Sequence, residues 1–256
     1  MLVTIFNVVL YQPLLNGLIL LYTYLPGHDF GVAIIILTLL IKFLFYPLGI
    51  KALKSQKAMA EIQPKIKELQ KKYKDDKEKQ TMEIMALYKE AKMNPFSGCF
   101  PILIQLPVLI ALYRVFWRGL QLDQIAPHLY SFVPKLESIN TSFLGLIDLS
   151  QSATMVIDNV RHYLWPNIIL IFLVGALQFV QAKLTMGRTK TGNDFSGQVQ
   201  KQMLYFMPAF MIMILINLPS AIALYFLTST LFTIGQQYVI MRNHGSDKPT
   251  TDKGIN

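Results

Sequence analysis

Long apolar runs alternate with short polar connections along most of this 256-residue chain. Several runs approach the roughly 20 residues that a helix needs to cross the hydrocarbon core of a bilayer. The pattern predicts an all-α, polytopic membrane protein with five transmembrane helices, at residues 28–50, 96–118, 163–183, 201–218 and 220–241. The composition agrees, since 53% of the residues are hydrophobic and only 15% are charged.

Residues 1–24 are uncharged and mostly apolar, but they are a weaker candidate for a further span. Pro13 interrupts the run, and Thr4, Asn7 and Tyr11 fall on one helical face. We therefore predict an outer amphipathic helix that lies in the membrane interface. A true span is the alternative, because the length alone would suffice.

Residues 51–95 form a different kind of segment, in which lysines surround a narrow apolar stripe. The stripe repeats at intervals of three or four residues, as on one helix face: Ile62, Ile66, Leu69 and Tyr73. Asp75-Asp76 marks a turn, and a second amphipathic stretch, "EKQTMEIMALYKEAKM", follows it. We predict a helical hairpin whose positive charge attracts anionic lipid or an RNA-bearing particle. The lack of aromatic interleaving argues against specific nucleic-acid binding.

The basic residues of the connections are distributed unevenly, which predicts the orientation. Residues 51–95 hold 12 lysines and residues 183–201 hold four basic residues, whereas residues 119–162 hold two basic residues and four acids. The first two connections and the tail at 242–256 are therefore predicted to be cytoplasmic. The N-terminus and residues 119–162 then face outward. Arg114, at the outer end of its span, weakly opposes this rule and can reach the headgroups.

Lys42 lies inside the apolar run "AIIILTLLIKFLFYPLG". A lysine at the centre of a membrane helix costs about 2.5–3.5 kcal/mol, and no predicted span offers an Asp or Glu to pair with it. An unpaired ammonium needs water, so Lys42 predicts a hydrated cavity among the helices. A snorkelling side chain is the alternative. Thr38 lies one turn away on the same face.

Three other spans place polar side chains at a similar depth: Gln105, Gln178, Gln181, Tyr225, Thr228 and Ser229. Together with Lys42 and Thr38 they can line a shared recess. Hydrogen bonding between helices is the alternative role for each of the uncharged residues.

No arrangement in the chain points to catalysis. The sequence contains no Walker loop, no GxGxxG and no HExxH motif, and its histidines lack metal-ligand spacing. We predict that the protein is not an enzyme and holds neither a metal nor a cofactor. The single cysteine, Cys99, excludes an internal disulfide framework.

Three stretches are similar to one family of membrane proteins: "IQPKIKELQKKYKDDKEK", "MALYKEAKMNPFSGCFPILIQLPVLIALY" and "FMPAFMIMILINLPSAIALYFLTSTLFTIGQQ". They resemble the YidC/Oxa/Alb family of membrane protein insertases. The resemblance implies an architecture of four parts, listed in chain order: an outer interfacial helix at 1–24, a five-span core at 28–50 and 96–241, a cytoplasmic hairpin at 51–95, and a short disordered cytoplasmic tail at 242–256.

The resemblance also implies a substrate-binding hydrophilic groove in the cytoplasmic leaflet, open to lipid and cytoplasm. Lys42 stands where the family has an arginine in the groove. The lysine keeps the positive charge but lacks the planar set of N–H donors of a guanidinium group. Gln181 matches a polar groove residue, and Tyr225 matches the first of a tyrosine pair whose second member is Phe226 here. With the other polar span residues, these are the expected groove contacts.

The implied function is the insertion and folding of nascent membrane proteins in the bacterial plasma membrane, without nucleotide hydrolysis. Nascent membrane proteins are the expected substrates. The Sec translocon, the ribosome, components of the signal recognition particle and anionic phospholipids are further expected partners. The large periplasmic domain of many Gram-negative members is expected to be absent. A small-solute transporter is the alternative, although no internal repeat supports it, and a non-catalytic scaffold is a third reading.

Overall fold

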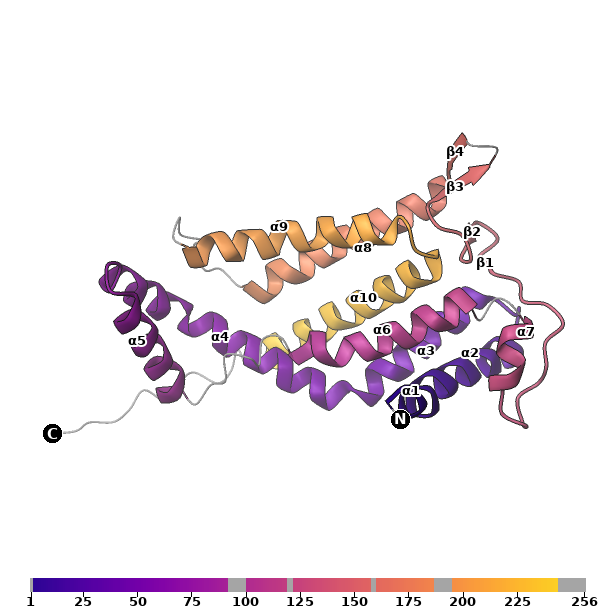
Figure 1. Ribbon diagram of the computed structural model, residues 1–256, viewed down its shortest axis with the longest axis horizontal. Helices are drawn as coiled ribbons and strands as arrows, with labels where there is room; N and C mark the ends of the chain where they lie inside the picture. Colours follow the sequence, from indigo (N-terminus) through magenta and orange to yellow (C-terminus); the bar gives the residue numbers. More distant parts are fainter. Residues whose placement is uncertain (1, 92–99, 119–121, 158–159, 187–194, 244–256) are drawn as a thin grey trace.

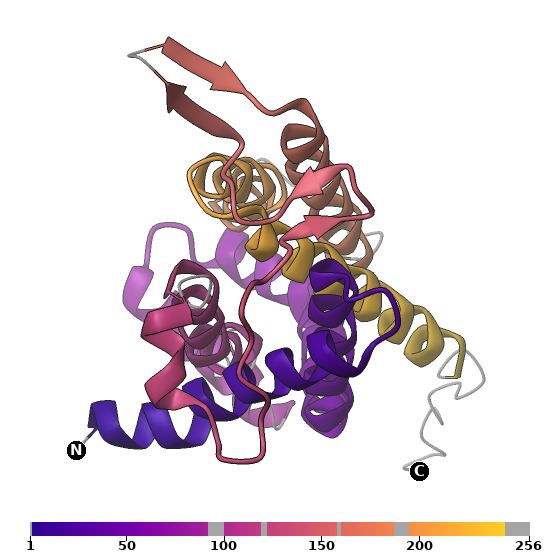
Figure 2. The ribbon, with the colours of Figure 1, turned by 90° about the vertical axis from the view of Figure 1, so that its right-hand side faces the viewer.

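The computed structural model describes residues 2–91, 100–118, 122–157, 160–186 and 195–243, and most of them are helical (Figure 1). The predicted tail at 242–256 therefore lies almost entirely outside the described residues, and residues 96–99 of the second predicted span lie outside them too. The long helices run side by side along the molecule, and short strands gather at one end (Figures 1 and 2).

The N-terminal segment is one continuous helical run with a π-helical turn inside it. It consists of α1 (Leu2–Phe6), the π-helix η1 (Asn7–Tyr11) and α2 (Gln12–Tyr24). Pro13 lies in the first turn of α2, directly after the π-helical turn. Figure 2 shows this run from the side, while α9 is seen close to end-on, so the N-terminal helix crosses the direction of the bundle.

The first predicted span, residues 28–50, coincides with a bent pair of helices. Helix α3 (Phe30–Leu44) is followed after Phe45 by α4 (Tyr46–Lys72), and the two are bent by 69°. Pro47 explains the break, because it has no N–H for the carbonyl group four residues before it. Helix α4 then continues without interruption into the predicted hairpin segment.

The C-terminal part of α4 packs against α5 (Lys77–Glu90) across a tight turn. The carboxylate of Asp76 caps α5 by accepting a hydrogen bond from the Lys79 N–H at 3.0 Å, and the Gln80 side chain donates to the carbonyl oxygen of Gln70 at 2.9 Å. The turn thus coincides with the predicted Asp75-Asp76. Ile66 is buried, whereas α5 has no fully buried residue.

Four helices complete the bundle: α6 (Phe100–Arg118), α8 (Trp165–Met186), α9 (Phe195–Leu215) and α10 (Ser220–Asn243). Helix α10 is central, because it packs against α3, α4, α6, α8 and α9 (Figure 1). The start of α10 is accordingly apolar and fully buried from Ala221 to Tyr225.

Two described helical stretches are long and apolar enough to cross a membrane unaided, Val3–Tyr24 and Trp165–Thr185, and the bent α3–α4 pair can form a third. Shorter apolar stretches occur at Gln105–Trp117 and Leu204–Leu215. Such large apolar helical surfaces are those of a membrane-inserted protein.

The connection between α6 and α8 contains structure that the all-α prediction did not include. After α7 (Leu122–Ile125) and a short 3₁₀ turn, two antiparallel pairs of strands follow: β1 (Ser142–Phe143) with β2 (Ile147–Asp148), and β3 (Thr154–Ile157) with β4 (Val160–Tyr163). Strands this short carry too few residues for a recognisable alternating pattern.

Hydrogen bonds fasten this connection to the ends of the helices. The buried Asn167 side chain of α8 donates to the Asp148 carbonyl oxygen of the connection at 3.0 Å, and the Ser220 N–H of α10 donates to the Gln151 carbonyl oxygen at 2.9 Å. Asn16 accepts from the Tyr130 N–H at 2.7 Å. The connection therefore closes this end of the bundle.

Candidate functional site

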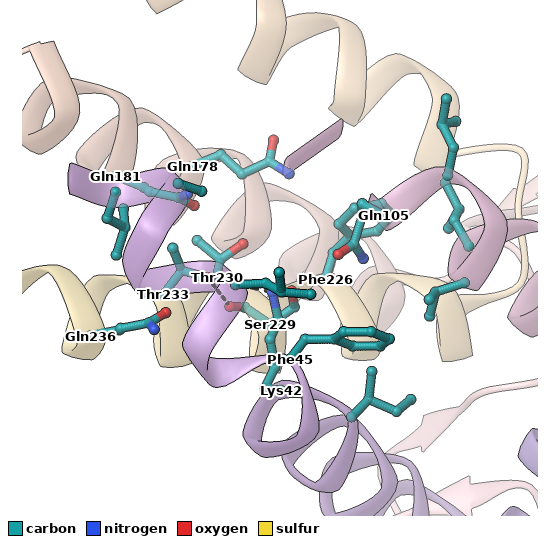
Figure 3. Close-up of a pocket in the computed structure, with 18 of the residues that line it drawn as sticks. Lys42, Phe45, Gln105, Gln178, Gln181, Phe226, Ser229, Thr230, Thr233 and Gln236 are labelled. Atoms are coloured by element: carbon teal, nitrogen blue, oxygen red, sulfur yellow. Dashed lines mark hydrogen bonds between the residues drawn. The ribbon is translucent and has the colours of Figure 1, made fainter. Parts of the chain in front are cut away.

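A pocket of about 390 Å³ lies among α3, α4, α6, α8, α9 and α10, and we call it the central pocket. Five of the residues predicted from the sequence line it: Lys42, Gln105, Gln178, Gln181 and Ser229. They come from four helices that are far apart in the chain. Figure 3 shows Gln178 and Gln181 approaching from one helix, Gln105 from another, and Lys42 between them.

Lys42 enters this pocket from the last turn of α3. Its Nζ lies 3.5 Å from Thr233 Oγ1, which is a long hydrogen bond. The described lining contains no Asp or Glu. A long bond to one neutral hydroxyl does not compensate an ammonium group, so Lys42 requires water or an acidic ligand in the pocket.

The other three predicted residues lie outside the described lining. Thr38 and Thr228 are buried, and their hydroxyls donate to carbonyl oxygens of their own helices, at 2.7 Å to Ile34 and 3.0 Å to Leu224. A threonine that bonds to its own helix needs no polar surroundings.

Tyr225, which is 1% exposed, also lies outside the described lining. Its hydroxyl accepts a hydrogen bond from the Gln105 side chain and so joins α10 to α6. This is the interhelical role considered as its alternative. The bond holds the Gln105 amide at the pocket wall, so Tyr225 positions a lining residue without lining the pocket.

The pocket has polar lining residues that were not among the predicted contacts: Gln56, Thr230, Thr233 and Gln236. A signal for Gln56 exists in the sequence. Lys42, Phe45, Gly49, Ala52 and Gln56 follow one another at spacings of three and four, which is one helical face. A domain boundary drawn at residue 51 divided this face between the span and the hairpin.

Helices α4 and α10 approach closely beside the pocket. A Cβ added at Gly49 would lie 2.9 Å from Gln236 Nε2, and Gln236 Nε2 itself donates to the Tyr46 carbonyl oxygen at 3.3 Å. Gln236 therefore supports the first turn of α4, directly after the bend, and Gly49 provides the space that it needs.

Apolar side chains complete the lining, among them Ile41, Phe45, Leu109, Met211 and Phe226. The pocket is consequently amphipathic. Its polar groups offer neutral hydrogen-bond donors and acceptors and one cation. Among the residues that the structure describes, no group of three or more His, Cys, Asp or Glu side chains is placed to hold a metal ion. The chemistry offered is reversible binding of a polar or acidic segment beside an apolar surface.

The chain was compared with known proteins. Residues 21–247 match the model of the family described as 60Kd inner membrane protein. The chain is 38% identical over 230 residues to the membrane protein insertase YidC of Syntrophus aciditrophicus, covering 90% of this chain and 36% of that protein. It is 34% identical over 232 residues to that of Syntrophobacter fumaroxidans, covering 91% and 38%. The chain thus spans little more than a third of the length of these curated relatives.

Proposed function

The chain belongs to the 60Kd inner membrane protein family, and from this premise we propose that it is a membrane protein insertase that inserts and folds nascent membrane proteins. Relatives named membrane protein insertase YidC support the proposal, since the similarity covers about nine tenths of this chain. The structural observation that carries it is Lys42, an ammonium group without a carboxylate partner in the described lining of a pocket among apolar helices.

The proposed arrangement in the membrane has five spans, formed by the α3–α4 bend region, α6, α8, α9 and α10. The N-terminus lies outside and the C-terminus in the cytoplasm of a bacterium. The lysines of residues 51–95 support a cytoplasmic hairpin. The transverse direction of residues 2–24 in Figure 2 supports an outer interfacial helix.

The central pocket serves in this proposal as a hydrated groove for the polar end of a substrate. The apolar part of a nascent segment moves along the lipid-facing helices while its polar tail enters the pocket. This shortens the hydrocarbon layer that the tail must cross and so lowers a desolvation penalty of several kcal/mol. Lys42 attracts acidic residues of the tail, and Gln105, Gln178, Gln181 and Ser229 replace part of its hydration.

The driving force is the transfer of the apolar segment into lipid, which contributes about 25 cal/mol for each Å² of apolar surface removed from water. The membrane potential adds to it by favouring outward movement of negative charge. No step in this scheme requires nucleotide hydrolysis. The hydrogen bonds of Asn167 and Ser220 to the α6–α8 connection hold it against the ends of α8 and α10.

The proposed partners follow from the same scheme. Nascent membrane proteins are the substrates. The basic hairpin is the contact surface for ribosomes, for the signal recognition particle and for anionic phospholipids, and the Sec translocon is a further partner in the membrane. Specific recognition of nucleic acid forms no part of the proposal. A transporter function is not favoured, because the matched relatives are named insertases.

The purified chain in liposomes tests the proposal. We expect a small test membrane protein to become protected from added protease, and we expect no flux of small solutes. Val239→Thr, an exposed position on α10 outside the pocket lining, is a control that should insert the test protein normally. Solute flux without insertion would support a transporter instead.

A further inference from the structure

Arg114 is a second charge on the apolar surface, and it is separate from the central pocket. It lies nine residues beyond Gln105, about 14 Å farther along α6 at 1.5 Å per residue, and no residue lines both this region and the pocket. Its Nη1 donates to Asn7 Oδ1 at 3.2 Å. The guanidinium also lies over the Phe6 ring, 4.9 Å from the ring centroid.

The π-helical turn at Asn7–Tyr11 accounts for this position. A π turn inserts an extra residue and so rotates the helix on either side of it. It packs against α6, with Tyr11 buried on the core side and in edge contact with the His128 ring at 5.4 Å. Asn7 is thereby placed against Arg114. One hydrogen bond to Asn7 uses one of the five N–H donors of the guanidinium group.

Two hollows meet at Arg114, one mainly apolar and the other lined by polar and apolar atoms in similar shares. One has a volume of about 460 Å³ and lies against the N-terminal helix, with Val3, Ile5, Phe6 and Val9 in its wall. The other has a volume of about 360 Å³ and is bounded by Ile110, Tyr113 and Trp117. Val3, Val9 and Trp117 are all more than half exposed in the isolated chain. Neither hollow has an acidic residue in its described wall.

We propose that Arg114 and these two hollows bind one phospholipid with a net negative headgroup. The guanidinium fork fits a phosphate oxygen pair, and the two hollows fit the two acyl chains that leave one headgroup. Tyr113 and Trp117, stacked with ring centroids 5.6 Å apart, suit the boundary between headgroups and acyl chains. A zwitterionic headgroup is disfavoured, because its ammonium group meets the arginine and finds no carboxylate in the described walls.

This lipid would also hold the N-terminal helix against α6, because its chains contact both. The assignment does not rest on the proposed insertase function: a chain that fails to insert proteins can still bind the lipid, and the tests are separate.

Native mass spectrometry of the full chain in detergent tests the proposal, with phosphatidylglycerol or phosphatidylcholine of identical acyl chains added. We expect the wild type to retain one phosphatidylglycerol and to prefer it over phosphatidylcholine. Arg114→Gln should weaken its binding at least about tenfold, since hydrogen bonds to a charged partner are lost. Arg114→Lys should lie between the two, because it keeps the charge without the fork. Lys135→Gln, an exposed basic residue of the outer connection, is the matched control and should bind like the wild type.

Val9→Trp keeps the proposal testable if Arg114→Gln does not fold. Val9 is 61% exposed, so a larger side chain there fills the hollow without entering the core, and it should reduce lipid retention with Arg114 intact. In a further comparison, phosphatidylglycerol should raise the melting temperature of the protein, whereas inorganic phosphate alone should not. Any of four results would overturn the proposed lipid site. The first two are equal retention of the two lipids by the wild type and equal losses of binding in Arg114→Gln and Lys135→Gln. The other two are unchanged lipid retention in Val9→Trp and full thermal stabilisation by inorganic phosphate.

Discussion

At the scale of single residues, Lys42 carries the proposed mechanism because its charge has so little compensation from the protein. A 3.5 Å bond to a threonine hydroxyl is the hydrogen bond that its ammonium group makes to the described helices. Removing an unpaired charge relieves a desolvation penalty, whereas removing one member of a buried ion pair leaves the other uncompensated. Lys42 can therefore be changed without loss of the fold, which makes it a clean probe of function.

We predict that Lys42→Ala folds normally but inserts substrates with acidic translocated tails about tenfold less well, as expected for loss of a charged hydrogen-bond donor. Substrates with neutral tails should change little, since transfer into lipid still drives them. Lys42→Arg should be active, and Lys42→Glu should be the least active with acidic tails because like charges repel. The measurement is insertion into liposomes of one substrate series that differs only in tail charge. Equal insertion of every substrate by all variants would show that Lys42 has no role in binding.

Asp148 is the second informative residue, and it lies in the α6–α8 connection rather than in a predicted span. Burial alone raises the pKa of its carboxyl group, but hydrogen bonds from Ser150 and Thr141 outweigh burial and hold the pKa below its ordinary value of 3.8. Ser150 Oγ and N–H donate at 2.6 and 2.9 Å, and Thr141 Oγ1 donates at 2.9 Å. The ionised form therefore stabilises this turn.

A depressed pKa stabilises the folded state above the ordinary pKa, and this stabilisation is lost as the pH falls through the folded-state pKa. We predict that the wild type melts at a higher temperature than Asp148→Asn at neutral pH and that this difference shrinks as the pH falls below 3.8. Because Asn does not titrate, the variant serves as the reference at each pH. A difference that stays constant from about pH 6 to about pH 3 would contradict the assignment.

The residues found from the sequence and those missed differ in one physical respect. Lys42 and Gln105 were recognisable because their polar groups cannot be satisfied by their own helix, so an apolar run that contains them needs a partner or water. A buried threonine hydroxyl bonds to the carbonyl oxygen four residues earlier, as Thr38 and Thr228 do, and hydropathy does not distinguish this from a lining position. Gln56 was missed because its helical face crosses a predicted boundary.

At the scale of elements, the bend between α3 and α4 decides how the hairpin meets the pocket. Lys42 stands before the bend, Gly49 and Gln56 after it, and all three line the same pocket. The sequence predicted both helical segments, but it placed the end of the span at residue 50. Pro47 marks the break in the sequence, whereas a bend of 69° is set by packing against α10 that no local pattern contains.

Gly49 tests this packing. We predict that Gly49→Ala displaces the Gln236 side chain, breaks its 3.3 Å bond to the Tyr46 carbonyl oxygen and lowers the free energy of unfolding by about 1 kcal/mol. In the Gln236→Ala background, Gly49→Ala should lower the free energy of unfolding much less. A double-mutant cycle measures this difference as the coupling energy between the two residues. Gly235→Ala is the control: nothing lies within 4 Å of a Cβ there, so greater helix propensity should make it neutral or stabilising. Additive effects of Gly49→Ala and Gln236→Ala would contradict the predicted contact.

At the scale of the whole molecule, the arrangement is asymmetric from end to end. Hydrogen bonds of Asn167 and Asn16 hold the α6–α8 connection and its short strands at one end, while the hairpin extends from the other (Figure 1). Counts of basic residues predict that the hairpin end faces the cytoplasm, and this stays a prediction that rests on composition alone. Residues 1–24 were harder to assign, since their length permits a span and their polar face permits an interfacial helix.

Three single cysteines placed in a Cys99→Ser background resolve the orientation and the N-terminal helix together. We predict that Thr4→Cys and Ser138→Cys react with a membrane-impermeant maleimide in intact cells, whereas Asp75→Cys reacts only after the membrane is opened. The reason is that an interfacial helix keeps Thr4 on the same side as the outer connection, and one span, α6, separates Ser138 from Asp75. All three side chains are exposed in the structure. A cysteine that does not react is therefore shielded by the membrane and not by burial within the protein. If residues 3–24 span the membrane, Thr4→Cys will instead react like Asp75→Cys. If the proposed orientation is inverted, all three reactivities will exchange.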